Sequence, residues 1–115
     1  MKRPAVSSRI KRGSGELAVL AVLADGPLHG YEIAKRIRAD TGGVVSFDVA
    51  ALYPILYAME ARGWVQAAWE QVPNGRRRRA YRLTVDGRRH LAPLRREWRE
   101  FFRALNRLAR FSDAW

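Results

Sequence analysis

The sequence predicts a mainly α-helical fold with one small β-hairpin, and three observations support this prediction. Apolar residues recur at helical spacing in three segments between residues 15 and 62. A partly alternating segment, a PNG turn and a second short strand-like segment come next. From residue 85 onward, apolar residues repeat in steps of three and four. The expected elements are therefore three short helices, a hairpin and one long helix.

Length and composition are those of one compact domain with an appended element. The 115 residues are 48% hydrophobic and include no cysteine, which excludes disulfides and cysteine-based zinc sites and suits a cytoplasmic protein. The longest unbroken apolar run, LAVLAVLA at residues 17–24, is far shorter than the ~20 residues that a membrane span needs. The net charge of +11 favours a polyanionic partner, although a codon bias toward arginine would give the same charge.

The first helix is expected to follow a flexible basic tail, residues 1–14. Ser14 is a competent N-cap for a helix that contains residues 17–24. Because these residues are apolar on nearly all sides of the helix, both sides should be covered by protein, and a second subunit is one candidate for the cover. The sequence DGP then ends the helix.

Two further helices are expected before residue 63. HGYEIAKRIRAD places apolar residues on one face and is ended by TGG. The third helix begins after Ser46 or Asp48, either of which is a competent N-cap, and runs to about Arg62, with Gly63 as its stop. Two helices joined by a glycine-containing turn are typical of a helix-turn-helix.

The third helix contains a proline inside its apolar repeat. Leu52, Leu56 and Met59 are spaced to face a core, but Pro54 removes one backbone donor and crowds the carbonyl of Ala50. We expect a kink at Pro54, so that the first turns point differently from the half that Leu56 and Met59 anchor. The missing donor is tolerable near a helix start, where some amides lack partners.

VQAAWEQV and AYRLT are expected to pair as a β-hairpin with a basic tip. The tip holds Arg76, Arg77, Arg78 and Arg79 beside a turn that its Asn-Gly pair closes. Because successive strand residues alternate, Arg76 and Arg78 should share one face and Arg77 and Arg79 the other. Such a run is usually a solvated surface, but its position on a hairpin favours contact with phosphates or a minor groove.

The last helix is expected from Val85 to about Arg110, with Thr84 as its cap and a bend at Pro93. Its apolar residues form a heptad seam. This pattern also fits an ordinary amphipathic helix lying on its own core. We favour dimerisation, because the preceding domain already has a complete set of elements. The residues of the predicted dimer seam are Leu91, Leu94, Trp98, Phe101, Leu105 and Leu108.

In this order the elements form a winged helix-turn-helix, with the DNA-binding domain at residues 15–84 and the dimerisation helix at residues 85–115. In that fold the third helix enters the major groove and the hairpin touches the neighbouring backbone or minor groove. For Tyr53, contact with phosphate and half-buried packing under the wing are equally good interpretations, whereas packing is favoured for Tyr57. The predicted DNA-binding residues are Ala50, Ala51, Tyr53, Pro54, Tyr57 and the four arginines Arg76, Arg77, Arg78 and Arg79.

Several motifs resemble those of the PadR family of bacterial transcriptional regulators, in its short form with a single C-terminal helix. They are GPLHGYEIAKRI, TGGVVSF, ALYPILYAMEARGWV, GRRRRAYRLTVDGRRHL and REWREF, in the family's order. The resemblance implies a homodimeric repressor that binds an inverted-repeat operator and is released by a small aromatic or drug-like ligand. It also implies dimerisation of the C-terminal helix against the first helix of the partner. Ala50-Ala51 replace the Gly-Thr that often precedes the LYP motif, which removes a hydroxyl that could contact phosphate.

The resemblance also implies a ligand site on the last helix. In short multidrug-responsive members a tryptophan there stacks on planar ligands, and Trp98, with Phe101 and Phe102 nearby, is similarly placed. Aromatic residues at seam spacing more often fill a core, and that is the favoured interpretation.

An enzyme is not expected. The two histidines, His29 and His90, lie on different elements, and no glycine-rich phosphate loop is present. No catalytic residue, metal site or cofactor is therefore predicted, and His29 is interpreted as a local hydrogen-bonding residue. An RNA-binding or anionic-membrane-surface module is the alternative function. A membrane-surface module would leave the basic wing unexplained, and no RNP-type aromatic strand is present.

Overall fold

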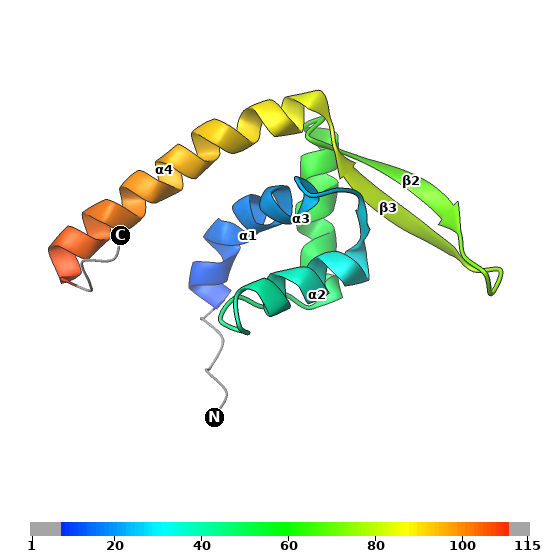
Figure 1. Ribbon diagram of the computed structural model, residues 1–115, viewed down its shortest axis with the longest axis horizontal. Helices are drawn as coiled ribbons and strands as arrows, with labels where there is room; N and C mark the ends of the chain where they lie inside the picture. The colour runs from blue at the N-terminus through cyan, green and yellow to red at the C-terminus, as the bar shows by residue number, and fades with distance from the viewer. Residues whose placement is uncertain (1–7, 111–115) are drawn as a thin grey trace.

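The computed structural model describes residues 8–110, and for residues 8–13 it describes the backbone alone. Its mainly helical architecture with a small antiparallel sheet and a long final helix confirms the predicted fold class (Figure 1). Residues 1–7 of the expected tail and residues 111–115 of the last expected segment lie outside the described residues. The elements are α1 Ser8–Leu23, β1 Leu28–His29, α2 Gly30–Asp40, α3 Val49–Ala61, β2 Val65–Gln71, β3 Arg77–Leu83 and α4 Val85–Ala109.

One apolar core lies where α1, α2 and α3 meet and continues under the sheet to the beginning of α4. Leu20, Ile33 and Leu52, one from each of the first three helices, have no exposed surface. Tyr81 of β3 is also fully buried, and its hydroxyl has no hydrogen-bond partner among the described residues. The packing of three helices against the base of the sheet fixes the position of α3 relative to the hairpin.

Helix α1 begins at Ser8, so the prediction that Ser14 caps it is wrong and the helix includes part of the expected tail. Ser14 and Gly15 lie inside the helix. A Cβ atom on Gly15 would lie 2.6 Å from Cδ1 of Ile55 in α3, so this glycine permits a close helix contact. The pair Ser14-Gly15 has the composition of a helix start. In the structure, Gly15 lies inside the helix and is required by the close contact with Ile55.

The sheet has three strands in the order β1-β3-β2, one more than the sequence predicted. The additional strand, β1, has only two residues, and it pairs Leu28 with Tyr81 and His29 with Ala80. His29 lies at the beginning of the second helix, as expected, where it is the N-cap of α2, and it is also the last residue of β1. The pairing of β1 with β3 joins residues far apart in the chain, and a segment of two residues is too short to show the alternation that predicts a strand.

Helix α4 is capped as predicted, because the Thr84 hydroxyl accepts a hydrogen bond from the Gly87 N–H at 3.0 Å. Its first turns are part of the domain. Gly87 and Leu91 are buried, and Leu94 packs against the core. Leu91, predicted for the dimer seam, is already buried within its own chain (6% exposed), so its contacts in the structure are with the domain core.

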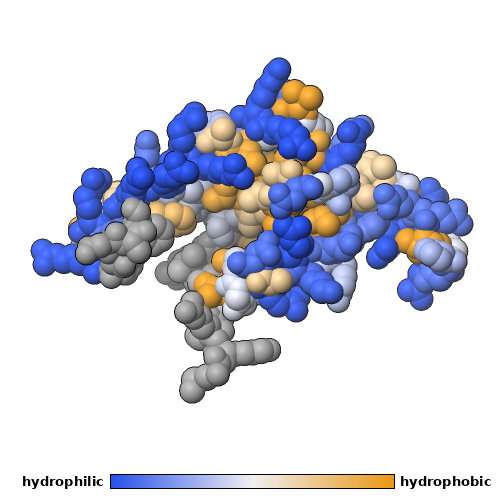
Figure 2. Space-filling model, in the orientation of Figure 1, coloured by the Kyte–Doolittle hydropathy of each residue, from blue (hydrophilic) through white to orange (hydrophobic). Residues whose placement is uncertain are grey.

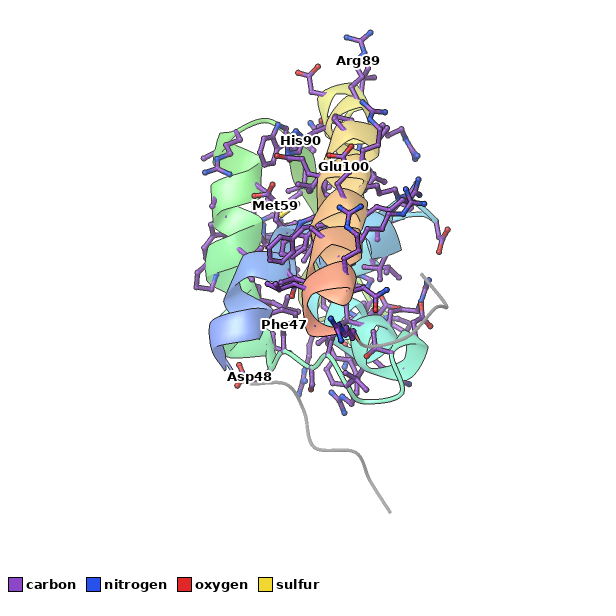
Figure 3. The ribbon with its side chains drawn as sticks, turned by 90° about the vertical axis from the view of Figure 1, so that its left-hand side faces the viewer. Phe47, Asp48, Met59, Arg89, His90 and Glu100 are labelled. Carbon is purple, nitrogen blue, oxygen red and sulfur yellow. The ribbon has the colours of Figure 1, made fainter. Side chains whose placement is uncertain are left out.

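The junction between α4 and the domain is reinforced by a polar cluster. The His90 ring stacks on Trp64 with 3.9 Å between ring centroids, and His90 Nε2 lies 3.2 Å from a carboxylate oxygen of Glu16. Glu16 also binds Arg62, at the end of α3. Figure 3 shows His90 at this end of α4, whereas Asp48 lies at the opposite end of the domain. The start of α4 is thus tied to both α1 and α3.

Within residues 8–110, no helix has the length and apolar character needed to cross a membrane.

Candidate nucleic-acid interface

Helix α3 turns one face to the core, as the sequence predicted. The Asp48 carboxylate caps it by accepting a hydrogen bond from the Ala51 N–H at 2.7 Å. Leu52, Leu56 and Met59 are buried on one face. Figure 1 shows α3 as one continuous helix, and the kink expected at Pro54 stays a prediction. The outward face is formed by small or rigid residues and one aromatic ring, namely Ala50, Ala51, Pro54, Tyr57 and Ala58.

The two tyrosines of α3 have different environments. Tyr53 is half-buried against the beginning of α2, where its hydroxyl would lie 3.4 Å from a Cβ atom on Gly30. Tyr57 is 50% exposed and stacks on Tyr53 with 5.7 Å between ring centroids. Tyr53 is thus held mainly by packing, whereas Tyr57, for which packing was favoured, packs on Tyr53 and is otherwise exposed. One face of the Tyr57 ring is supported, and the remainder is available to a partner.

The beginning of α2 is tied to the hairpin by His29. Its backbone N–H and its Nδ1 both contact the Glu32 carboxylate, and its Nε2 lies 2.9 Å from Glu70 of β2. Hydrogen bonds from His29, first from its backbone and then from its ring, lower the pKa of Glu32, and the positive charge of Arg78 contributes. This agrees with the interpretation of His29 as a hydrogen-bonding residue. It couples the helix-turn-helix to the wing, here defined as β2, β3 and their connecting turn.

The wing ends in a tight turn. The Gly75 N–H donates to the Val72 carbonyl and the Val72 N–H donates to the Arg76 carbonyl, both at 3.0 Å. Gly75 has a φ of +82°, in the left-handed region that favours glycine, as a three-residue hairpin loop requires. Arg76 is therefore at the turn. The other three arginines of the predicted basic tip follow directly in β3 and pair with residues of β2, so the basic segment extends from the turn into the strand.

The arginines of β3 lie on two faces, as the alternation predicted. Arg77 and Arg79 are on the same face as Trp69 of β2, with their guanidinium carbons 5.3 and 5.8 Å from the centroid of the indole ring. Arg78 is paired across the strands with Glu70, on the face that His29 contacts. Figure 2 shows that the visible surface of the wing is largely hydrophilic.

Arg79 is not a free cation. Its guanidinium forms an ion pair with Glu60 of α3 at 2.9 Å, and the two side chains are 28% and 34% exposed. This bridge connects the wing to α3 and partly neutralises Arg79. A direct contact with DNA is therefore less favoured for Arg79 than for Arg76 and Arg77, whose side chains are exposed. Helical and strand periodicity could not reveal a contact between residues 19 positions apart.

Trp69 was not among the predicted site residues, although its side chain is 58% exposed beside two arginines. The alternation of β2 could have indicated it. Val65 and Ala67 contact the core, and Trp69 is the next residue on the same face, beyond the core. The cross-strand register, which pairs Trp69 with Arg79, was needed to place it.

The aromatic residues of α4 cluster without a surrounding core. Trp98 lies 5.7 Å from Phe101 and 5.6 Å from Phe102 between ring centroids. Phe101 is 52% exposed. These three rings, predicted from the resemblance as a ligand site, therefore contact one another on the distal part of the helix. No group of three or more metal-ligating side chains occurs among residues 8–110.

Comparison with known proteins agrees with this geometry. Residues 19–93 match the model of the transcriptional regulator PadR-like family. A protein of Lysinibacillus sphaericus named uncharacterized protein X is 30% identical over 95 residues, which cover 83% of this chain and 87% of that protein. A transcriptional regulator from Clostridium thermocellum has a TM-score of 0.79 at 27% identity, covering 90% of this chain and 97% of that one.

A PadR family transcriptional regulator from Eggerthella lenta is similar over 90% of this chain and 88% of its own, with a TM-score of 0.76 and 26% identity. The family consists of transcriptional regulators, which agrees with the prediction that the chain is not an enzyme and implies that it binds DNA. With a family match over most of its length and the helix-turn-helix, wing and long final helix in place, this chain belongs to the PadR-like family of transcriptional regulators.

Proposed function

We propose that the protein is a homodimeric, sequence-specific DNA-binding repressor whose release from DNA is triggered by a small aromatic ligand. The observation that carries the DNA-binding part is the side-by-side placement of the exposed face of α3 and the arginine-bearing wing, fixed by the ion pair between Arg79 and Glu60. Small residues at Ala50 and Ala51 let the backbone of α3 approach base edges closely. Arg76 and Arg77 lie on the adjacent wing, where phosphates would be contacted.

Dimerisation is supported by the distal half of α4. Phe101, Leu105 and Leu108 are 52%, 37% and 82% exposed, although they continue the heptad spacing of Leu91 and Leu94. A row of exposed apolar side chains at this spacing is the pattern of a helix with a partner. Leu17, Ala18 and Ala21 of α1 are also incompletely covered, and they offer a second surface to the partner's α4.

A symmetric dimer constrains the DNA site. Two copies of α3 would enter successive major grooves about 34 Å apart, so we expect an inverted-repeat operator with half-sites one helical turn apart. The test is selection of random duplexes by the purified full-length protein at physiological salt. An enriched inverted repeat supports the proposal, whereas absence of enrichment refutes sequence-specific recognition. Stronger competition by single-stranded RNA or by anionic vesicles would point instead to the corresponding alternative function.

The effector part of the proposal depends on Trp98. Its ring and those of Phe101 and Phe102 lie within 6.3 Å of one another between centroids, on the surface that the dimer would bring together. Two symmetry-related indoles could then hold a flat ligand between them. A planar cationic dye should quench tryptophan fluorescence and displace the selected duplex, and both effects should be lost in Trp98→Ala. A dye that binds without displacing DNA would refute the role of the site in release.

A further inference from the structure

The corner between α3 and the wing contains an exposed indole, that of Trp69, which has no role in the function proposed above and lies beside two guanidinium groups. Its floor is the ion pair of Glu60 and Arg79, which joins the two elements at 2.9 Å. On the α3 side stands Tyr57, half exposed and stacked on Tyr53. The wing side is formed by Trp69, with the Arg77 guanidinium carbon 5.3 Å from the ring centroid.

Trp69 is not required to fill the core. Along the same face of β2, Val65 is 2% exposed and Ala67 packs against the core, whereas Trp69 is 58% exposed. A large indole left in water is unfavourable unless it has a partner, and two guanidinium groups at 5.3 and 5.8 Å cover only part of its surface. The uncovered part of the ring lies on the face of the wing that turns toward α3, because Arg79 on that face reaches Glu60.

The geometry of a duplex identifies what would occupy this corner. If α3 lies in a major groove and the wing touches the neighbouring minor groove, the strand that separates those grooves must pass between the two elements. That strand alternates anionic phosphates with deoxyribose rings, whose edges are largely apolar. The corner likewise sets an exposed guanidinium, Arg77, beside an exposed aromatic ring, Trp69.

We propose that the corner binds the sugar-phosphate backbone, with Trp69 packed against a deoxyribose and Arg77 bound to the adjoining phosphate. This inference rests on the DNA-binding function proposed above and extends it to a residue outside the recognition helix and the wing tip. Arg79 acts as a positioning residue, because its guanidinium forms an ion pair with Glu60 and also contacts the indole of Trp69. Since no base edge is involved, the contact is independent of sequence and forms on any duplex.

The direct test observes the indole. The full-length protein is labelled with 5-fluorotryptophan, and its fluorine resonances are followed while a 30-base-pair duplex of mixed sequence is added. The Trp69 resonance is assigned from its loss in Trp69→Phe, and Trp64, stacked on His90, is the internal control. We expect the Trp69 resonance to shift with the bound fraction and the Trp64 resonance to stay in place. An unchanged Trp69 resonance on fully bound protein overturns the proposal.

Affinity for the same duplex, measured by fluorescence anisotropy, distinguishes the contribution of Trp69 from that of Arg77. Trp69→Ala should weaken binding about tenfold through lost apolar contact, and Trp69→Phe should recover most of that loss. Arg77→Gln should reduce the slope of log affinity against log salt by about 0.9, the value for one phosphate. Arg82→Gln is the matched control, because Arg82 lies on the same strand but on the opposite face, where it contacts Gln66.

The outcomes distinguish this inference from the function on which it rests. If the wild-type protein does not bind duplex at all, DNA binding itself is refuted. If the wild-type protein binds and Trp69→Ala binds equally well, only the backbone corner is refuted. Equal salt slopes for Arg77→Gln and Arg82→Gln would refute the phosphate contact of Arg77. Thermal unfolding of each variant checks that the fold is retained, and Trp69→Phe supplies a conservative version if Trp69→Ala unfolds.

Discussion

The two halves of α4 have the same heptad spacing and opposite environments. In the first half, Gly87 and Leu91 are buried and His90 stacks on Trp64. In the second half, Leu105 and Leu108 are 37% and 82% exposed. Apolar spacing therefore predicts which side of a helix tends to be covered, but not whether the covering surface belongs to the same chain. In α4 the first part of the repeat packs against the domain core, and the second part is exposed.

The change between the halves follows from the dimensions of the domain. Helix α4 has 25 residues, and the structure shows its distal part extending beyond the end of the helix-turn-helix (Figure 1). At a rise of about 1.5 Å per residue, a helix of this length is longer than the sheet base and α1 can cover. Only its first turns therefore pack against the domain core, and the remainder extends beyond it.

The largest expected effect comes from filling the closest contact of the first half. A Cβ atom on Gly87 would lie 2.1 Å from the carbonyl oxygen of Trp64, and backbone cannot move aside as a flexible side chain does. Gly87→Val should lower the free energy of unfolding by about 4 kcal/mol or more, measured by urea denaturation. Val85→Ala, at a position that is 65% exposed two residues earlier, is the control and should change it by less than about 0.5 kcal/mol. Equal stability of the two variants would show that α4 does not dock closely on Trp64.

Removing a buried side chain from the first half should have the next largest effect. Leu91→Ala should destabilise the domain by about 3 kcal/mol, since a side chain that is 6% exposed leaves a cavity. Leu108→Ala removes the same atoms from a site that is 82% exposed. Both variants are compared in the Leu105→Asp background, so that subunit association does not contribute to the measured stability. Similar destabilisation by the two substitutions would remove the distinction between the halves.

In the second half the expected effect is on assembly and not on folding. Leu105→Asp places a charge in the proposed seam and should weaken dimerisation at least about thirtyfold, as truncation of a central interface residue does. Sedimentation should show monomers with an unchanged far-ultraviolet circular dichroism spectrum. Arg103→Gln, which also lowers the net charge by one but lies off the seam, should stay dimeric. A dimeric Leu105→Asp protein would refute the seam.

The smallest expected effect concerns the polar cluster at the junction. His90→Ala removes a ring stacked 3.9 Å from Trp64 and a contact with Glu16, both partly exposed. Because exposed interactions of this kind are weak, we expect a loss of about 1 kcal/mol in the free energy of unfolding. His90→Phe should recover the stacking part of that loss. A loss larger than that of Leu91→Ala would mean that the cluster, and not the apolar contact, attaches α4 to the domain.

Local patterns in the sequence determined most of the fold. The sequence predicts Thr84 as a cap and offers Asp48 or Ser46 for the third helix, because a short oxygen-bearing side chain is needed to accept from the first amides of a helix; the structure selects Asp48. The buried face of α3 followed from the spacing of Leu52, Leu56 and Met59. The joint occurrence of several motifs also indicated the family, which the comparisons confirm. These features depend on residues that are close in the chain, so they are visible without the fold.

Only the tertiary structure decided the features that join distant residues. The ion pair of Arg79 with Glu60, the contact of Gly15 with Ile55 and the pairing of β1 with β3 each depend on how the elements pack. The same is true of the division of α4 into a buried and an exposed half. Hydrophobic spacing reports which side of a helix avoids water, because burial is non-directional. What covers that side, and which arginine remains available to DNA, depends on the three-dimensional arrangement of the chain.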